Sequence, residues 1–406
     1  MNKKVLEGIT VADFGNAWAG PLFARSLGDM GARVIKVESL KHMDVTRLLP
    51  PWEPGKGITY NNSGYYSYMN RNKLAVQLDV STPKGLELCK KILEISDIMV
   101  ENYAFGVMKR LGLGYEDVQK VNPKIIYVSM TPFGSQGPMT NYVMYGRPQV
   151  YASGMAYTTG YPDMAPLCLP TSFGDPVATH HGLFAALSAL RYRSKTGKGQ
   201  FIELSQWEGL VSIQPENIMD YTLNKRIRVR QINKDEFMAP HNFYRCREGD
   251  LKWVAIAVAS DEEWAALCKV MGNPEWTKDK KYADGYGRWK NQEEMDPLIE
   301  EWTLNYEQYE LAEMLQKEGV AAFPCLSNRG LVEDPHLNAR GFFEEWDHPE
   351  IGVKKYDGML WKMNRTPPRV ERPAPMLGEH NNYVFGELLG LPQEEIDQLV
   401  KDKILF

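Results

Sequence analysis

The chain has 406 residues, of which 43% are hydrophobic and 24% charged, with a formal net charge of −5. This length exceeds one ordinary hydrophobic core, so we expect two domains. The composition is typical of a soluble globular protein, and the acidic balance argues against nucleic acid and anionic membranes as partners. No apolar run approaches the roughly 20 residues of a membrane helix, and no hydrophobic signal core opens the chain. We therefore expect a cytoplasmic protein.

The cysteines and histidines predict neither a disulfide framework nor a metal site. His180 and His181 are adjacent, so on a helix they point in different directions and do not chelate as a pair. No two cysteines have CxxC spacing. The cysteines are odd in number and widely spread, at Cys89, Cys168, Cys246, Cys268 and Cys325.

The first half of the chain alternates strand-like and helix-like segments. Strands are predicted over residues 9–14, 33–38, 74–80, 97–102, 125–130 and 201–204. Helices are predicted over residues 21–30, 82–95 and 177–193. This alternation predicts a doubly wound, mostly parallel sheet, in which ligands bind beyond the carboxyl ends of the strands. Three segments follow such ends: Gly15–Gly20, Asn102–Tyr103 and Thr131–Gly134.

The turn between the first strand and its helix has glycines at its two ends. It lies in a βαβ unit that mimics a dinucleotide-binding fold. Bulky Trp18 stands between Gly15 and Gly20, however, and the phosphate fingerprint GxGxxG is absent. We therefore disfavour a dehydrogenase that binds NAD or FAD. The N–H groups at such a helix start still favour a bound anion.

A single carboxylate, Asp175, lies between Gly174 and Pro176 at the start of the predicted helix 177–193. Pro suits the first helical position, and Asp is among the preferred N-caps. The local pattern therefore favours Asp175 as a helix cap. The same geometry would also hold an exposed carboxylate that acts as a nucleophile.

The second half of the chain predicts a smaller domain. Residues 223–236 are rich in Arg, Lys and Asn and are interpreted as a linker. A hairpin over 243–258 and helices over 262–271, 295–303 and 308–318 predict an α+β domain that covers 237–344. Residues 347–375 are proline-rich and predicted irregular. Helices over 381–389 and 393–405 are expected to return to the large domain, which we assign to residues 1–222 and 345–406.

Several segments together resemble the class III CoA-transferases, the family typified by formyl-CoA and carnitine CoA-transferases. Each segment is a weak signal alone, but their order and spacing carry the resemblance. It implies a Rossmann-like large domain, an inserted smaller α+β domain and two subunits that interlock as a dimer. The matching segments are Ala19–Pro21, Gly31–Glu38, Asn72–Lys73, Leu78–Asp79, Asp97–Tyr103, Arg110–Leu113, Gly174–Asp175, Lys195–Gln200 and Leu377–His380.

The resemblance implies that Asp175 is the nucleophile. A carboxylate attacks a thioester to give a mixed anhydride, and the released CoA thiolate then gives an aspartyl-CoA thioester. Trp18 and Tyr145 are the expected substrate-binding residues. No tightly bound cofactor is expected, because the coenzyme A thioester is itself a substrate. The residues expected at the CoA site are Lys73, Asn102, Tyr103 and Arg110.

Read without the family, the same residues have ordinary structural roles. Lys73 and Arg110 would be solvated surface charges. Asn102 would be a turn residue after a strand, and Trp18 would pack in the core.

Two features depart from the family pattern. Residues 237–242 lack the glycine run that closes over the aspartate in formyl-CoA transferases, so no lid residue is assigned. The pair Tyr145–Gly146 stands where α-methylacyl-CoA racemases have a His-Asp pair. A racemase needs a base there, so it is kept only as an alternative. A non-catalytic subunit of a heteromeric transferase is a second alternative, against which the presence of Asp175 argues.

The expected partners are an acyl-CoA and a small carboxylic acid, bound by a homodimer or by a heteromer with a related subunit. Family analogy favours succinyl-CoA as the donor. Aromatic residues near the expected site hint at an aromatic acceptor, although aromatic side chains pack cores equally well.

Overall fold

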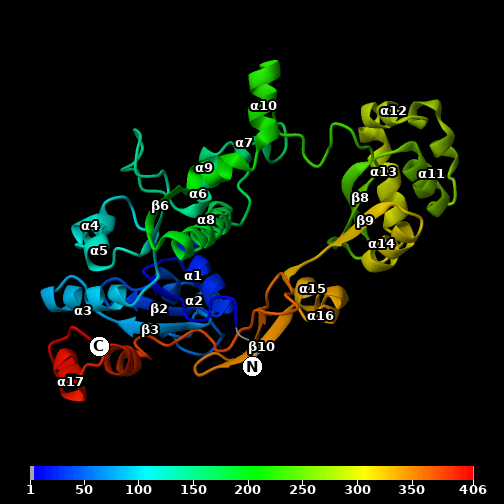
Figure 1. Ribbon diagram of the computed structural model, residues 1–406. Coiled ribbons are helices and arrows are strands. Elements are labelled where there is room, and N and C mark those ends of the chain that lie inside the picture. Colours follow the sequence, from blue (N-terminus) through cyan, green and yellow to red (C-terminus); the bar gives the residue numbers. More distant parts are fainter. Residues whose placement is uncertain (1–3, 406) are drawn as a thin grey trace. The chain divides into compact units, whose positions relative to one another are not determined.

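The computed structural model describes residues 4–405. Its main sheet has six parallel strands in the order β3-β2-β1-β4-β5-β6 (Figure 1). The order reverses between β1 and β4, which is the switch point of a Rossmann-like sheet. The predicted mixed α/β fold with a parallel sheet is therefore confirmed. The strands are β1 Thr10–Asp13, β2 Arg33–Glu38, β3 Lys73–Gln77, β4 Ile98–Glu101, β5 Ile126–Thr131 and β6 Gln200–Ser205.

Helices cover both faces of this sheet, as the buried strands of a parallel sheet require. Helices α1 (Ala19–Asp29) and α8 (Gly174–Thr196) pack on one face through Phe23, Leu27 and Ala186. Helices α3 (Pro83–Glu94) and α5 (Tyr115–Val121) pack on the other. Other helices in residues 1–227 are α2 Gly64–Asn70, α4 Val107–Arg110, α6 Gly146–Ala152, α9 Gln206–Ser212, α10 Pro215–Asn224 and the 3₁₀ turn Val45–Leu48.

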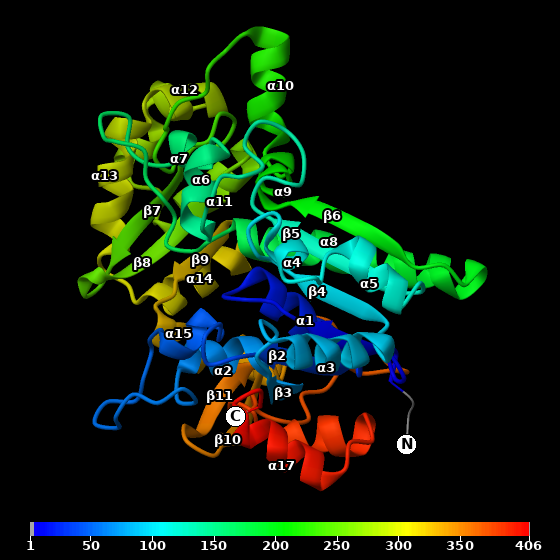
Figure 2. The ribbon, with the colours of Figure 1, turned by 90° about the vertical axis from the view of Figure 1, so that its left-hand side faces the viewer.

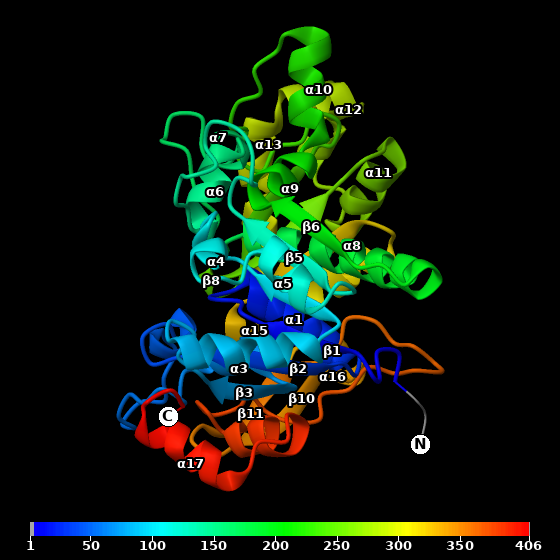
Figure 3. The same ribbon diagram turned by 60° about the vertical axis from the view of Figure 1, so that its left-hand side comes forward.

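The C-terminal segment returns to the open edge of the sheet. The N–H of His380 donates to Ala75 O at 3.0 Å, and Leu405 forms a bridge with Leu78. A π-helical segment, Asn382–Leu388, and helix α17, Gln393–Lys401, then contribute to the core on the α3 face. Figures 2 and 3 show these red helices beside β3.

The proline-rich segment 347–375 is not irregular throughout, so that prediction was wrong in part. An antiparallel hairpin is formed by β10 (Phe343–His348) and β11 (Gly352–Asp357), with Pro349 in its turn. Glu345 faces Lys355 across it. Such opposite-charge pairs stabilise a hairpin without producing the hydrophobic alternation that predicts a strand.

A second compact unit comprises residues 157–167 and 228–340, while residues 1–156, 168–227 and 341–406 form the first. The antiparallel sheet of the second unit contains the expected hairpin of β7 (His241–Cys246) and β8 (Gly249–Ala257), and a third strand, β9 (Ala321–Cys325). The sequence missed β9 because Pro324 and two alanines lower its strand propensity, and an edge strand tolerates them. The short helix α7, Met155–Thr158, crosses the boundary between the two units. The other elements of the second unit are α11 Asp261–Val270, α12 Gly285–Lys290, α13 Gln292–Thr303, α14 Gln308–Lys317, α15 Asn328–Glu333, α16 Pro335–Ala339 and 3₁₀ turns at Glu275–Lys278 and Lys280–Tyr282.

Within residues 4–405, no helix has the length and apolar character needed to span a bilayer.

Candidate active site

Hydrogen bonds to Asp13, Asp44 and Asn102 hold the turn between β1 and α1 in place. Asn102, just after β4, accepts a hydrogen bond from the N–H of Asn16 at 2.8 Å and donates to Asn16 O at 2.9 Å. The N–H of Gly15 donates to Asp13 Oδ1 at 2.7 Å. The N–H of Ala17 donates to Asp44 Oδ1 at 3.2 Å. The structure therefore places Asn102 at the predicted ligand-binding edge, where its side chain holds this turn.

The two glycines of this turn are required by close approach. A Cβ atom on Gly15 would lie 2.6 Å from the carbonyl carbon of Gly20. A Cβ atom on Gly20 would lie 2.8 Å from Asn102 Oδ1. The glycines thus let the chain fold back on itself beside Asn102, and no phosphate fingerprint is needed to explain them.

Lys73 is buried beside Asp13, and its ammonium group is enclosed by protein atoms, which argues against the prediction that it contacts the CoA phosphates. Its side chain is 0% exposed. Its Nζ donates to Asp13 Oδ2 at 2.7 Å, to Asn70 Oδ1 at 2.8 Å and to Pro21 O at 2.9 Å. Those three bonds use all the donors of an ammonium group. Burial lowers the pKa of Lys73 to about 8, and Asp13 opposes that shift.

We expect Lys73→Met to destabilise the protein by about 3 kcal/mol, because it removes the nearer of the two ammonium groups that pair with the buried Asp13 carboxylate, the other being Lys36 at 3.9 Å. Methionine keeps the length of the side chain, so the loss reports the charge and not a cavity. Urea unfolding measures the change, with Lys195→Met on the exposed end of α8 as the control. If Lys73→Met left the urea midpoint unchanged but weakened CoA binding, the result would instead support the predicted contact between Lys73 and the CoA phosphates.

Asp175 lies inside the first turn of α8, which begins at Gly174. The residue at the N-cap position is Phe173, and no side chain caps the helix there. The prediction that Asp175 caps the helix was therefore wrong. Its carboxylate instead accepts a hydrogen bond from the backbone N–H of Ala19, the first residue of α1. Thr179, one turn further along α8, donates to Ala19 O at 2.9 Å.

The starts of α1 and α8 thus converge on one carboxyl group. Burial raises the pKa of Asp175 to about 7, and the hydrogen bond from Ala19 opposes the shift. Tyr65 lies close enough for the Asp175 charge to act on it, and burial together with that charge raises the pKa of Tyr65 to about 12. A carboxyl group whose pKa is raised toward neutrality, beside two helix starts, is typical of functional sites.

Trp18 and Tyr145 have different positions relative to Asp175. Trp18 immediately precedes Ala19 and packs edge to face against Tyr65, with 6.2 Å between ring centroids. Its indole Nε1 is buried and has no hydrogen-bond acceptor among the described residues. Tyr145 is 77% exposed, whereas its neighbour Gly146 packs closely against Asp175.

Gly146, the first residue of α6, forms a wall of the Asp175 site that the sequence did not reveal. A Cβ atom at this position would overlap Asp175 Oδ2 and the Cβ of Ser172. Its distance to Ser172 Oγ would be 2.7 Å. The sequence showed only that a racemase base is missing at this position. The structure shows that, because residue 146 has no side chain, the Asp175 carboxylate can occupy the space beside it.

Two buried glutamines, Gln149 and Gln206, form a hydrogen-bonded pair beside the start of α8. Gln206 Nε2 donates to Met130 O at 2.8 Å, at the end of β5, and Gln149 Nε2 donates to Gln206 Oε1 at 2.8 Å. Because a carbonyl cannot donate, the Met130 bond fixes the orientation of both amides. Gln149 Oε1 therefore faces Gly174, where a Cβ atom would overlap it. The two residues are far apart in sequence, so no local pattern could have identified the pair.

Tyr103 and Arg110 lie on the other side of β4. Tyr103 is half-buried and lines an apolar cavity of about 130 Å³ at the carboxyl ends of the strands. Arg110 ends α4 with an exposed side chain that has no ion-pair partner within residues 4–405. Other residues that line this cavity include Phe14, Val37, Leu78, Val80 and Met108. The cavity is lined mainly by apolar side chains, which suits a ring, and exposed Arg110 can bind an anion.

Comparison with known proteins shows extended similarity over the whole chain. Residues 6–381 match the family described as CoA-transferase family III. The succinyl-CoA–D-citramalate CoA-transferase of Chloroflexus aurantiacus is 31% identical, over 98% of each chain. The human succinyl-CoA:glutarate CoA-transferase is 27% identical, over 98% of this chain and 89% of its own. Among solved structures, a CaiB/BaiF family protein from Brucella suis superimposes with a TM-score of 0.86 and 28% identity, covering 96% of this chain and 100% of its own.

Proposed function

The chain belongs to CoA-transferase family III, and from this premise we propose that it transfers coenzyme A from an acyl-CoA donor to a carboxylic acid, with Asp175 as the nucleophile. The observation that carries this proposal is the convergence of α1 and α8 on the Asp175 carboxyl group. The relatives named above are CoA-transferases, which supports the same reaction class.

In the first step, the Asp175 carboxylate attacks the carbonyl carbon of the acyl thioester. The C–S bond breaks, CoA leaves as a thiolate, and a mixed anhydride forms between the acyl group and Asp175. The thiolate then attacks the aspartyl carbonyl, which releases the donor acid and leaves an aspartyl-CoA thioester. The acceptor carboxylate repeats these steps in reverse. No proton or electron is gained or lost over the full cycle.

Each attack places negative charge on a carbonyl oxygen close to the starts of α1 and α8. Helix starts carry partial positive charge and free N–H groups, so they stabilise a developing oxyanion. Ala19 already directs its N–H at the Asp175 carboxyl group. Trp18 supplies a buried N–H that has no acceptor within residues 4–405, and we assign this donor to the acyl group or to the same oxyanion.

Asn102, Tyr103 and Arg110 are proposed to hold CoA at the switch point of the sheet. Asn102 fixes the turn along which the pantetheine arm would run. The apolar cavity beside Tyr103 suits the adenine ring, and exposed Arg110 suits a phosphate. Lys73 has no part in this arrangement, because its ammonium group is enclosed by Asp13, Asn70 and Pro21.

We propose succinyl-CoA as the donor, since the Chloroflexus and human relatives are named for it. The aromatic acceptor stays a prediction, supported by the pair of Trp18 and Tyr65 beside Asp175. No observation favours a racemase, because Gly146 offers no side chain that could remove a proton.

An interlocked homodimer with an inserted small domain is proposed for the assembly. Helix α10 exposes four large apolar side chains, which in a soluble protein indicate a covered surface. Figure 3 shows α10 projecting from its unit. These side chains are Ile218, Met219, Tyr221 and Leu223. Sedimentation equilibrium should give twice the chain mass; a monomer at micromolar concentration would contradict the dimer.

Transfer should lose rate as the pH falls below about 7. The pKa of the Asp175 carboxyl group is raised to about 7, and only the carboxylate form attacks the thioester. We therefore expect kcat/KM to fall about tenfold per pH unit below that value and to be constant above it. A profile that stays flat down to pH 5 would contradict the assignment of this group.

The function itself is tested by incubating the protein with succinyl-CoA and a panel of aromatic and aliphatic acids. Chromatography of the CoA esters should show a new thioester and free succinate in equal amounts. Hydrolysis alone, or inversion at the α-carbon without exchange of the acid, would contradict a transferase.

A further inference from the structure

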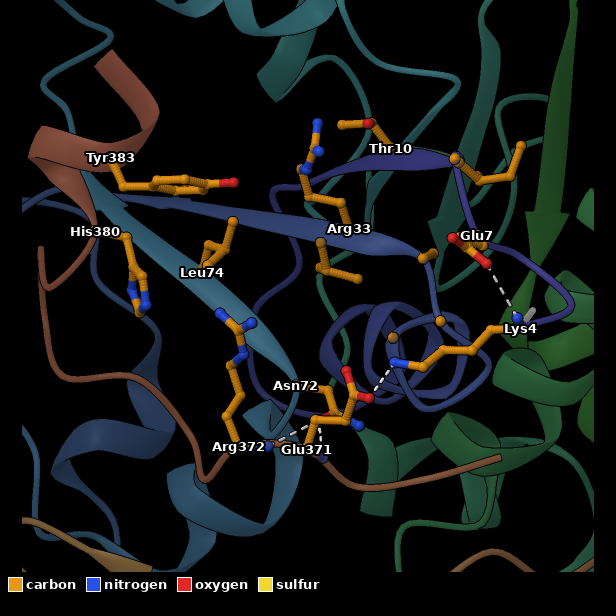
Figure 4. A pocket seen from close by; sticks show the side chains of 16 residues that line it. Lys4, Glu7, Thr10, Arg33, Asn72, Leu74, Glu371, Arg372, His380 and Tyr383 are labelled. Atoms are coloured by element: carbon orange, nitrogen blue, oxygen red, sulfur yellow. Dashed lines mark hydrogen bonds and ion pairs between the residues drawn. The ribbon is translucent and has the colours of Figure 1, made fainter. Parts of the chain in front are cut away.

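The two ends of the main sheet differ in how their charged side chains are arranged. Where β1 and β2 begin, a cavity of about 560 Å³ is bordered by Arg33 and Arg372, which point apart on opposite sides of β2 (Figure 4). Toward the carboxyl end of β2, by contrast, two buried charges meet, with 2.9 Å between Lys36 Nζ and Asp44 Oδ2. This buried pair lies against the turn Gly15–Gly20, which the proposed reaction uses.

One residue of this turn has an unusual backbone conformation. Ala17 has a φ of 62°, in the left-handed region that is unfavourable for a residue with a Cβ atom and free for glycine. Directly after it come Trp18, whose indole N–H we assign to the acyl group or the oxyanion, and Ala19, whose N–H reaches the Asp175 carboxyl group. The conformation of Ala17 therefore decides where both of these N–H groups point.

The buried pair binds the turn at two points. The N–H of Ala17 donates to Asp44 Oδ1 at 3.2 Å. The same oxygen accepts from the N–H of Thr46 at 3.0 Å and from Thr46 Oγ1 at 2.7 Å, which fixes the carboxylate itself. Lys36 Nζ, beside Asp44, donates to Gly15 O at 2.8 Å. A strained backbone persists only where its surroundings impose it, and here the Lys36–Asp44 pair does so.

We propose that Asp44 is a positioning residue: by holding Ala17 in its left-handed conformation, it directs the N–H groups of Trp18 and Ala19 at the reacting centre. Asn102 supports the residue before Ala17, whereas Asp44 binds Ala17 itself. The effect of Asp44 on the rate rests on the proposed transferase function. Its effect on the conformation of the turn does not.

Asp44→Asn is the first test, because an amide cannot replace this carboxylate. Donors face both of its oxygens, from Ala17 and Thr46 on one side and from Lys36 on the other. Asparagine has one accepting oxygen, so one group of donors would face its NH₂ group. We expect kcat to fall about 100-fold, as for a reacting group displaced by about 1 Å. Asp163→Asn, which removes an exposed carboxylate, should leave kcat unchanged.

Glycine at residue 17 distinguishes a positioning role from general damage to the fold. Because glycine adopts a positive φ without strain, the loss caused by Asp44→Asn should be about tenfold smaller in chains that also carry Ala17→Gly. If Asp44→Asn cost the same with alanine and with glycine at residue 17, the proposal would be wrong.

A second pair of variants leaves Asp44 intact, in case Asp44→Asn folds poorly. Valine and asparagine are similar in size, but asparagine tolerates a positive φ and β-branched valine does not. We therefore expect kcat to be at least about tenfold lower in Ala17→Val than in Ala17→Asn. Equal kcat values in these two variants would show that the conformation of Ala17 does not matter.

The position of the turn is measured without any reaction by fluorine NMR of fluorotryptophan-labelled protein, in which Trp18→Phe identifies the Trp18 signal. This signal should move in Asp44→Asn and in Ala17→Val, and should return toward its parental position in Asp44→Asn/Ala17→Gly. A Trp18 signal that stays in place in Asp44→Asn would overturn the proposal. If the parent chain exchanged no CoA, the proposed function would fail, while a signal that moves as described would still support the hold of Asp44 on the turn.

Discussion

Asp175→Asn is expected to lower kcat/KM for CoA transfer by about 1000-fold or more, because the amide cannot form the anhydride. Asparagine has nearly the same shape and keeps an oxygen that accepts the hydrogen bond from Ala19. The start of α8 should therefore remain in place, and acyl-CoA should still bind. Steady-state exchange between an acyl-CoA and a free acid measures the loss.

A matched control is Asp163→Asn, which removes an exposed carboxylate. It should leave the rate of exchange within twofold of the parent, in keeping with the small effects of surface substitutions. Substantial exchange by Asp175→Asn, with the control behaving as expected, would show that another group attacks the thioester.

Gly146→Ala is expected to lower kcat about 100-fold, because displacement of a reacting group by about 1 Å costs that much. The new Cβ atom would overlap Asp175 Oδ2 and the side chain of Ser172. Residue 146 does not have a positive φ, so alanine brings no backbone strain there. The affinity for CoA, which is held beyond β4 in our proposal, should change little.

Gly57→Ala is the control for this substitution. Gly57 also lacks a positive φ, and a Cβ atom there would meet nothing within 4 Å. Its exchange rate and urea midpoint should match those of the parent chain. Normal kcat in Gly146→Ala would show that the Asp175 carboxylate has more freedom than this packing implies.

The sequence predicted the sheet well, because its signals are local. Residues 33–38 form the strand β2 with the predicted bounds, since the β-branched residues Val34, Ile35 and Val37 favour a strand soon after Gly31. The place of Asn102 at the carboxyl end of β4 also followed from strand order. The sequence also showed that the glycine-bounded turn, with Trp18 inside it, lacks the dinucleotide fingerprint.

The predictions that were wrong depended on partners far away in the sequence. Nothing near Lys73 shows that Asp13 and Pro21 will enclose its ammonium group. The local pattern made Asp175 a cap, but Ala19 of another helix binds its carboxylate. The Gln149–Gln206 pair, likewise, exists only once α6 and α9 have packed together.

The most direct test of the account is to trap the covalent intermediate. The protein is incubated with succinyl-CoA alone, digested, and analysed by mass spectrometry. We predict a peptide that contains Asp175 and carries CoA less one water, and its absence from Asp175→Asn. A protein that exchanges CoA without this adduct, or that carries it on another carboxylate, would contradict the assignment of Asp175 as the nucleophile.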